Sequence, residues 1–232
     1  MGFSDSHHFR RMVAGVCMVM GPLLALAAAV VSPAFHTDAG DQLASVAANQ
    51  DRFLAAMLIS MLAVALLLVA ALGLMHMLRE RMAGYGSAGG AMAVVGLMAY
   101  MAQIGFALTQ WQMVRDGVQA SDVATVDGAT HTAALVIPLA IVPLLSAVGF
   151  VTLAAGLWRA HVVDWWMAAA VAVGSVLIVL RGLVASMGLG IVGAAVFLGG
   201  VGAIGLMVLR ESDADWEHTP EYRGFRPSMH MG

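Results

Sequence analysis

Long apolar runs constrain this chain more strongly than any other feature of its sequence. Several segments long enough to cross a bilayer carry almost no charge, and they recur along most of the 232 residues. The hydrocarbon core of a bilayer is about 30 Å thick and takes about 20 apolar residues per helix. Only 11% of the residues are charged, whereas a soluble domain carries about 25%. The sequence therefore predicts an all-α, multi-pass integral protein of the cell membrane.

The apolar runs divide into six predicted transmembrane helices. The first four are expected over residues 12–32, 52–78, 91–113 and 132–158. The stretch 165–209 is too long for one crossing, so it is predicted to form a helical hairpin that turns within 186–190. The six helices make up a transmembrane domain over 12–209, between a polar N-terminal segment, 1–11, and a polar tail, 210–232, which is expected to be mobile.

The segments between the predicted helices are interpreted as loops. Residues 84–90 contain four glycines and are predicted to form a short turn. The polar stretches 36–51 and 115–130 are predicted as external loops, and 159–164 as an internal one. The first apolar run ends in Ser-Pro-Ala-Phe at 32–35, which does not resemble a cleavage site, so a retained signal anchor is expected.

Arginine positions predict how these helices are oriented. All eleven basic residues of the chain are arginine. With both termini in the cytoplasm, eight lie in internal segments and three in external ones: Arg10, Arg11, Arg79, Arg81, Arg159, Arg210, Arg223 and Arg226 against Arg52, Arg115 and Arg181. This asymmetry satisfies the positive-inside rule. Trp111, Trp158, Trp165 and Trp166 also fall at helix ends, where indole rings prefer the interface.

Composition excludes several classes of function. The chain has no lysine, so Schiff-base chemistry of the retinal or pyridoxal type is excluded. A net charge of −3 gives no basis for a nucleic-acid partner. The single cysteine, Cys17, cannot form an intrachain disulfide. Because Ser60, Ser146 and Ser175 lie within predicted helices without a histidine or an acid in register, no catalytic residue is predicted.

Glycine is abundant, with 26 residues, and concentrates in the predicted last hairpin. The glycines there include Gly182, Gly188, Gly190, Gly193, Gly199, Gly200, Gly202 and Gly205. Residues 188–193 also match G-x-G-x-x-G, but a dinucleotide site needs a preceding soluble strand, and this segment is an apolar hairpin. Small residues let membrane helices approach closely, so these glycines predict helix packing.

One candidate metal site lies on the predicted outer side. His36, Asp38 and Asp41 follow the first predicted helix, while Asp127 and His131 precede the fourth. Imidazole and carboxylate groups together can bind zinc or another divalent ion. The alternative is that these side chains simply solvate short loops, because their spacing matches no known ligand motif.

A second candidate metal site contains soft ligands. Met75, His76 and Met77 form a Met-His-Met triplet that recurs at 229–231, and Cys17 is expected at a similar depth to His76. Thioether and imidazole groups suit copper. The alternative is that methionine fills irregular apolar gaps, and adjacent helical residues point in different directions.

Three polar residues inside predicted helices form a candidate ligand site. Gln103 and Gln110 lie seven residues apart, hence on one face of a helix, and Arg181 is the single charge of the last hairpin. Intramembrane ionisable residues are often functional. Interhelical hydrogen bonding by the glutamines and snorkelling by Arg181 are the alternatives.

Several short motifs resemble a known group of membrane proteins. They are Ser32-Pro33-Ala34-Phe35-His36, Ala47-Ala48-Asn49-Gln50-Asp51-Arg52-Phe53, Leu78-Arg79-Glu80-Arg81 and Gly156-Leu157-Trp158-Arg159-Ala160. The pattern over residues 10–210 is similar to DUF-type multi-helix integral membrane proteins of high-GC bacteria, especially actinobacteria. This resemblance implies an inner-membrane location and transfers no catalytic residue.

The sequence thus predicts a non-enzymatic membrane protein that acts through helix packing. We expect a structural or accessory subunit of a larger membrane assembly, in contact with lipids and with other subunits or copies of itself. The alternative function is a transporter or binding protein for a small molecule or for copper or zinc.

Overall fold

The computed structural model describes residues 3–34, 36, 39–118, 137, 141–184 and 186–216. Its helices are α1 (Phe3–Val31), α2 (Ala39–Ala48), α3 (Gln50–Leu78), α4 (Ala83–Arg115), α7 (Leu144–Arg159), α8 (Trp165–Val184), α9 (Met187–Phe197), the π-helical turn η2 (Leu198–Gly202), α10 (Ala203–Arg210) and α11 (Asp213–Trp216). α9, η2 and α10 follow one another without a break and form one rod. These residues contain no strand, which confirms the predicted all-α class.

Five helical segments are long and apolar enough to cross a membrane. They are His8–Val31, Gln50–Leu78, Ala83–Arg115, Trp165–Gly182 and Met187–Arg210. α7 is a further apolar helix of 16 residues, and at 1.5 Å per residue it is only about 24 Å long. Most of the residues before it, where the fourth predicted helix begins, lie outside the described part of the chain. Length and composition are thus those of a multi-pass membrane protein.

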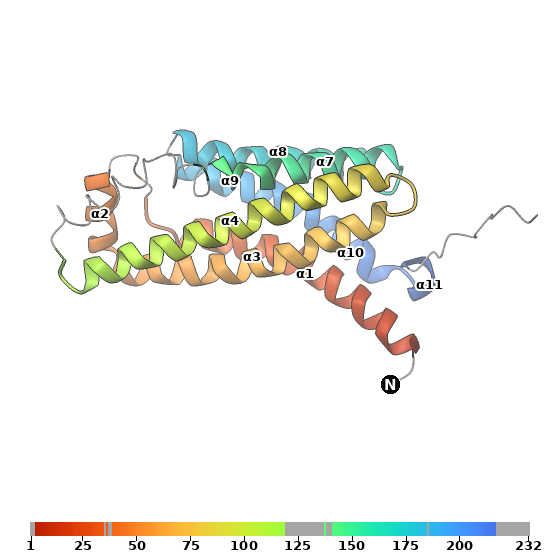
Figure 1. The fold of residues 1–232 in the computed structure, drawn as a ribbon, viewed down its shortest axis with the longest axis horizontal. Helices are drawn as coiled ribbons and strands as arrows, with labels where there is room; N and C mark the ends of the chain where they lie inside the picture. The colour runs from red at the N-terminus through yellow and green to blue at the C-terminus, as the bar shows by residue number, and fades with distance from the viewer. Residues whose placement is uncertain are drawn as a thin grey trace, which may run out of the picture.

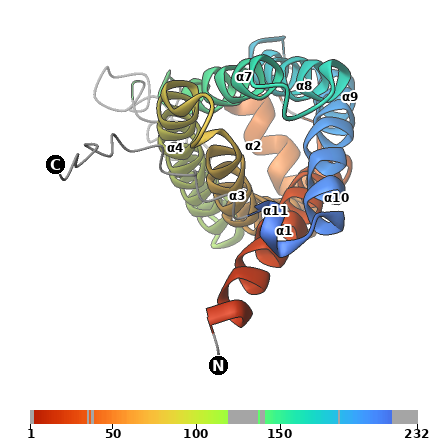
Figure 2. The ribbon, with the colours of Figure 1, turned by 90° about the vertical axis from the view of Figure 1, so that its right-hand side faces the viewer.

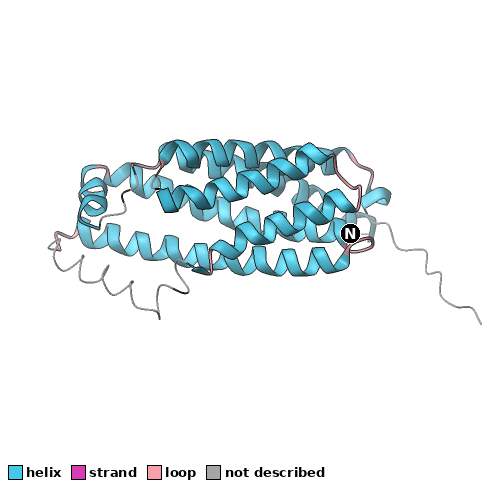
Figure 3. Cartoon of the chain, turned by 90° about the horizontal axis from the view of Figure 1, so that it is seen from above, coloured by secondary structure: helices cyan, strands magenta, loops and turns pink. Residues whose placement is uncertain are grey.

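The long helices form a ring in which each packs against its neighbours in the sequence. α1 packs against α3, α3 against α4, α4 against α7, α7 against α8, and α8 against α9. The rod then closes the ring by packing against α1, as the end-on view shows (Figure 2). The beginning of α1 and α11 lie at one end of the bundle, and α2 lies across the other end (Figures 1 and 3).

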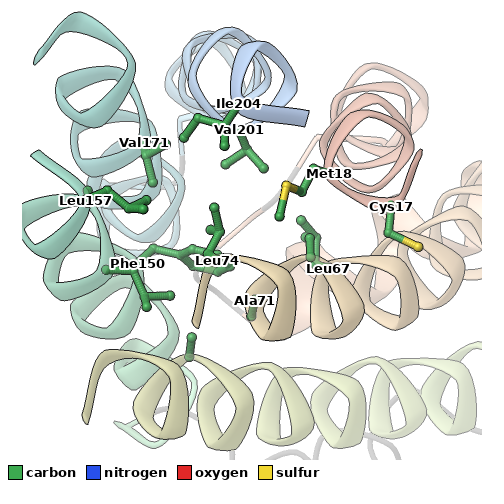
Figure 4. Close-up of a cluster of buried hydrophobic side chains, with 14 of the residues drawn as sticks. Cys17, Met18, Leu67, Ala71, Leu74, Phe150, Leu157, Val171, Val201 and Ile204 are labelled. Atoms are coloured by element: carbon green, nitrogen blue, oxygen red, sulfur yellow. The ribbon is translucent and has the colours of Figure 1, made fainter. Parts of the chain in front are cut away.

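Apolar side chains from around the ring meet at its centre (Figure 4). Met18 of α1, Leu74 of α3 and Ile204 of α10 are fully buried there. Phe150 of α7 packs edge to face against Phe197 of α9, with ring centroids 5.0 Å apart. Because lipid tails are as apolar as these side chains, close packing holds such a bundle together rather than removal from water.

α4 and α7 touch through their backbones because both helices carry glycine at the contact. A Cβ atom built on Gly149 would lie 2.2 Å from the Ala93 nitrogen. A Cβ on Gly96 would lie 2.1 Å from the Ser146 nitrogen. No side chain fits into either gap, so glycine sets the distance between these two helices.

Glycines of the rod serve the same purpose, which confirms part of the packing prediction. Gly193 and Gly200 meet the backbone of α8, while Gly205 meets Met18 and the Gly15 carbonyl of α1. Three other predicted packing glycines have open space around a built Cβ: Gly182, Gly188 and Gly199. Close helix contact therefore explains Gly193, Gly200 and Gly205, but it does not explain the three glycines that have open space around them.

The predicted turn at 84–90 is wrong, because these residues form the first turns of α4, which begins at Ala83. Gly86 and Gly89 are buried, and a Cβ on Gly90 would collide with the Met75 sulfur. Glycine lowers helix propensity by about 1 kcal/mol relative to alanine, but here it permits close contact with α3 and α7. The chain actually turns at residues 79–82.

The predicted external loop at 36–51 is also wrong in part. It contains α2, and α3 already begins at Gln50. Leu43 and Val46 of α2 are buried, and this helix packs against α3 and α4. The His36 backbone N–H donates to the Gln42 side-chain oxygen at 2.9 Å, which joins the end of α1 to α2.

Helix that was not predicted occurs in the described parts of both terminal segments. α1 begins at Phe3 rather than at residue 12, and the first residues of the predicted polar tail contain α11. Residues 217–232 lie outside the described part. The hairpin turn is confirmed, because Ser186 caps α9 and its hydroxyl accepts a hydrogen bond from the Leu189 N–H at 3.3 Å.

Candidate functional site

The outer metal candidate is only partly within the described residues. His36 is exposed after α1, and Asp41 is exposed in the first turn of α2. Asp38, Asp127 and His131 lie outside the described part of the chain. The structure thus places two members of the predicted group near one end of the bundle and does not test the group as a metal site.

The three side chains of the Met-His-Met triplet at the end of α3 contact different parts of the structure. Met75 lies against Gly90 of α4, and Met77 packs partly buried against the apolar core. His76 stacks on Trp216 of α11, with ring centroids 4.8 Å apart. Cys17 is buried on α1 among apolar residues. The triplet joins three parts of the bundle rather than converging on one point.

Gln103 lies on the exposed side of α4, away from the rest of the bundle. Its side chain is exposed, about four residues, or ~6 Å, from the middle of a 33-residue helix. Gln103 makes no hydrogen bond within the part of the chain that the structure describes. Gln110 is half-buried further along the same helix. The Thr109 hydroxyl donates a hydrogen bond to the Gly105 carbonyl at 3.1 Å.

Exposed residues of α4 form a continuous stripe of mostly small side chains, which we name the outer face of α4. Its members recur at alternating spacings of four and three residues: Gly84, Ala88, Ala91, Val95, Met98, Ala102, Gly105 and Thr109. Neither Gly84 nor Gly105 has an atom within 4 Å of a built Cβ. Gln103 flanks this face. The spacing is that of a helix surface that packs along a second helix.

Arg181 lies apart from the two glutamines. It occupies the last turn of α8, where its aliphatic stem covers Gly190 of α9. α8 packs against α7 and α9, whereas Gln103 and Gln110 lie on α4, which packs against α3 and α7. The structure does not bring the three predicted ligand residues together in one pocket. A position at a helix end suits a snorkelling arginine.

At the opposite end, Arg11 links α1 to the end of the rod, and its side chain is almost completely buried. Its Nη1 group donates to the Val208 and Leu209 carbonyls at 3.2 Å each and to the Glu211 carbonyl. Its Nε group donates to the Asp213 carboxylate at 2.7 Å. The last carbonyls of a helix lack intrahelical partners and carry partial negative charge. A buried guanidinium therefore caps this helix end.

α11 completes this arrangement by placing Trp216 against α3. Trp216 is only 8% exposed, and its carbonyl oxygen lies 3.3 Å from His76 Nε2. Arg79 Nη1 lies 3.2 Å from His76 Nδ1. A single neutral tautomer, protonated on Nε2, satisfies both contacts. We call Arg11, Asp213, His76 and Trp216 the clasp, because together they hold α11 against α1 and α3.

Two further arginines connect helices at the same end. Arg81 donates to the Ala160 carbonyl at the end of α7 at 3.1 Å. Arg159 donates to the Tyr85 hydroxyl, and its guanidinium lies over that ring at 5.3 Å from the centroid. The arginines that predict the orientation of the chain thus also join its helix ends.

The clasp predicts a loss of stability in acid. Desolvation acts to raise the pKa of Asp213, but hydrogen bonds from Arg11 and His8, and their charges, outweigh it and hold this pKa below its ordinary value. A depressed folded-state pKa adds stability above the unfolded pKa of about 4, and this stability disappears as pH falls through the lowered value. We expect the unfolding temperature in detergent to fall as the pH is lowered below about 4. An Asp213→Asn variant should lack it, and equal slopes in both proteins would contradict the assignment.

The polar contacts of the described residues mainly join helices. Within the described ranges, no group of three or more histidine, cysteine, aspartate or glutamate side chains could hold a metal ion. The exposed amide of Gln103 stands apart, because it faces away from the bundle without a partner among those residues. No family model, no curated protein and no solved structure matches this chain.

Proposed function

We propose that this chain is a structural or accessory subunit of a larger membrane assembly and that the outer face of α4 is its contact surface. The observation that carries the proposal is the exposed Gln103 amide beside a stripe of small residues. Transfer of an amide from water to hydrocarbon without a hydrogen bond costs about 4–8 kcal/mol. A partner helix that accepts and donates to this amide removes most of that cost.

Small residues on the outer face of α4 support the same proposal. Glycine within a helix is unfavourable by about 1 kcal/mol, and Gly105 has no close neighbour within the bundle that needs the space. Small residues at alternating spacings let a second helix approach the backbone closely, and polar side chains then bond across the contact. An α4 that packs against a partner accounts for both features.

The proposed topology has six crossings, with both termini in the cytoplasm. The antiparallel ring supports an even number of crossings, because the beginning of α1 and α11 meet at one end. The arginine asymmetry of eight to three supports a cytoplasmic location for that end. The sixth crossing contains α7.

Site-specific crosslinking in native membranes tests the contact surface. In a Cys17→Ser background, a single cysteine replaces Ala102 on the outer face of α4, or Leu62, an exposed residue of α3, as a matched control. The chain has no lysine side chain, so a thiol-to-amine crosslink to a lysine identifies a different protein, whereas a disulfide-linked species of twice the mass of the chain identifies a second copy. We expect crosslinks from position 102 and none from position 62.

Two leucine substitutions separate docking from folding. Gly105 and Gly182 are both exposed, and neither has an atom near a built Cβ. Gly105→Leu should abolish copurification of the partner, whereas Gly182→Leu should preserve it. Gln103→Leu should weaken the association by about 1 kcal/mol, the usual size of an interhelical hydrogen bond in lipid. A partner-free monomer in native mass spectrometry of mildly solubilised wild-type protein would overturn the proposal.

A further inference from the structure

An open groove of about 490 Å³ lies between the first turn of α8 and the end of α10. Met167, Ala203, Leu206 and Met207 form its apolar walls, and the charged residues Arg210 and Glu211 also line it. Leu206 is half exposed, so the groove opens on the side of the ring that faces lipid. The groove is shallow and open, so it suits a ligand that stays in contact with the surrounding lipid rather than an enclosed small molecule.

The groove lies at the depth of the lipid headgroups. Arg210 is the last residue of the membrane-crossing rod, and the exposed Trp165 and Trp166 begin α8 next to Met167. Tryptophan side chains at helix ends prefer the membrane interface. The apolar walls therefore extend from this level toward the hydrocarbon core, and Arg210 and Glu211 line the groove at the end of the rod.

The charges of the groove define the chemistry of its ligand. Arg210 supplies one positive charge, which suits the phosphate of a phospholipid. Glu211 supplies one negative charge, so the two side chains together are neutral. A phospholipid with a negative phosphate and a positive ammonium in its headgroup matches this pair, whereas a headgroup with net negative charge meets repulsion from Glu211.

We infer that this groove binds phosphatidylethanolamine, a zwitterionic phospholipid with a primary ammonium group. Arg210 holds the phosphate, Glu211 lies beside the ammonium, and an acyl chain lies along Leu206 and Met207. A primary ammonium donates three hydrogen bonds to oxygen acceptors, while the quaternary ammonium of phosphatidylcholine has no N–H to donate. The groove thereby distinguishes two lipids of the same net charge.

Native mass spectrometry of the full chain tests this inference with phosphatidylethanolamine, phosphatidylcholine and phosphatidylglycerol that carry identical acyl chains. The wild-type protein should retain phosphatidylethanolamine in preference to the other two. Arg210→Gln should reduce the binding of all three about fivefold, the usual effect of one basic residue at the membrane surface. Glu211→Gln should remove the preference for phosphatidylethanolamine over phosphatidylcholine and increase binding of phosphatidylglycerol.

Two control variants keep the inference falsifiable. Arg115→Gln removes an exposed arginine at the opposite end of the bundle and should leave lipid retention unchanged. Ala203→Trp fills the groove and should release the lipid while thermal unfolding remains cooperative. The inference is overturned if phosphatidylcholine binds as tightly as phosphatidylethanolamine, if phosphatidylglycerol is preferred, or if Arg115→Gln reproduces the loss seen with Arg210→Gln.

Discussion

A Gly96→Ala variant is expected to unfold at a clearly lower temperature than the wild-type protein. The new methyl group would lie 2.1 Å from the Ser146 nitrogen and 2.7 Å from its Cα, so no side-chain rotation can relieve the clash. α4 and α7 must therefore move apart. Overpacking of this kind costs about 1–3 kcal/mol and occasionally more, and we expect the upper end because backbone meets backbone. Thermal unfolding in detergent measures the change.

A glycine-to-alanine substitution at another position of α4 serves as the control, because it should not lower the stability. Gly105 has no atom within 4 Å of a built Cβ, so Gly105→Ala adds only helix propensity, worth up to about 1 kcal/mol. It should raise the unfolding temperature slightly or leave it unchanged. If Gly96→Ala behaves like Gly105→Ala, the close approach of α4 and α7 is incorrect. A cooperative transition in both variants shows that they fold.

Replacement of Arg11 by methionine is expected to have the second large effect. Methionine keeps much of the apolar volume but leaves the terminal carbonyls of α10 without their Arg11 donor, and it leaves the Asp213 carboxylate with His8 in place of both partners. A buried polar group that loses its hydrogen-bond partner costs about 1–3 kcal/mol. We expect about 3 kcal/mol, the upper end of that range, because the buried Arg11 guanidinium donates to the Val208, Leu209 and Glu211 carbonyls.

Arg10 provides the matched control for this substitution. It is exposed on the same turn of α1, so Arg10→Met should change stability by no more than about 0.5 kcal/mol. Hydrogen exchange should locate the effect of Arg11→Met, with faster exchange in α10 and α11 and little change in α4. Equal destabilisation by both variants would show that the clasp does not depend on the buried guanidinium.

The helices themselves were largely predictable, because hydropathy reports on the solvent around each segment. The end of α3 at Leu78, the start of α8 at Trp165 and the turn near Ser186 agree with prediction. Residues 84–90 were mispredicted because glycine favours turns in water, whereas here it lies at a helix contact. The pattern of glycines alone does not distinguish these two uses.

The clasp was not predicted, because its members are far apart in the sequence. Arg11 and Asp213 lie 202 residues apart, and His76 meets Trp216 across 140 residues. The available signal was a tryptophan in the polar stretch 210–219, three residues after an aspartate. That spacing places both side chains on one side of a short helix, but it does not identify the helices they contact.

By itself, the sequence determined that this chain is helical and that several of its segments are long and apolar enough to cross a membrane. A bilayer admits such segments only as structures that satisfy their own backbone hydrogen bonds. Tertiary structure alone decided which glycines meet a neighbouring backbone and which face outward. It also decided that Arg11 is buried while Arg10 is exposed. Such differences depend on the order of helices around the ring, and no local pattern of residues encodes that order.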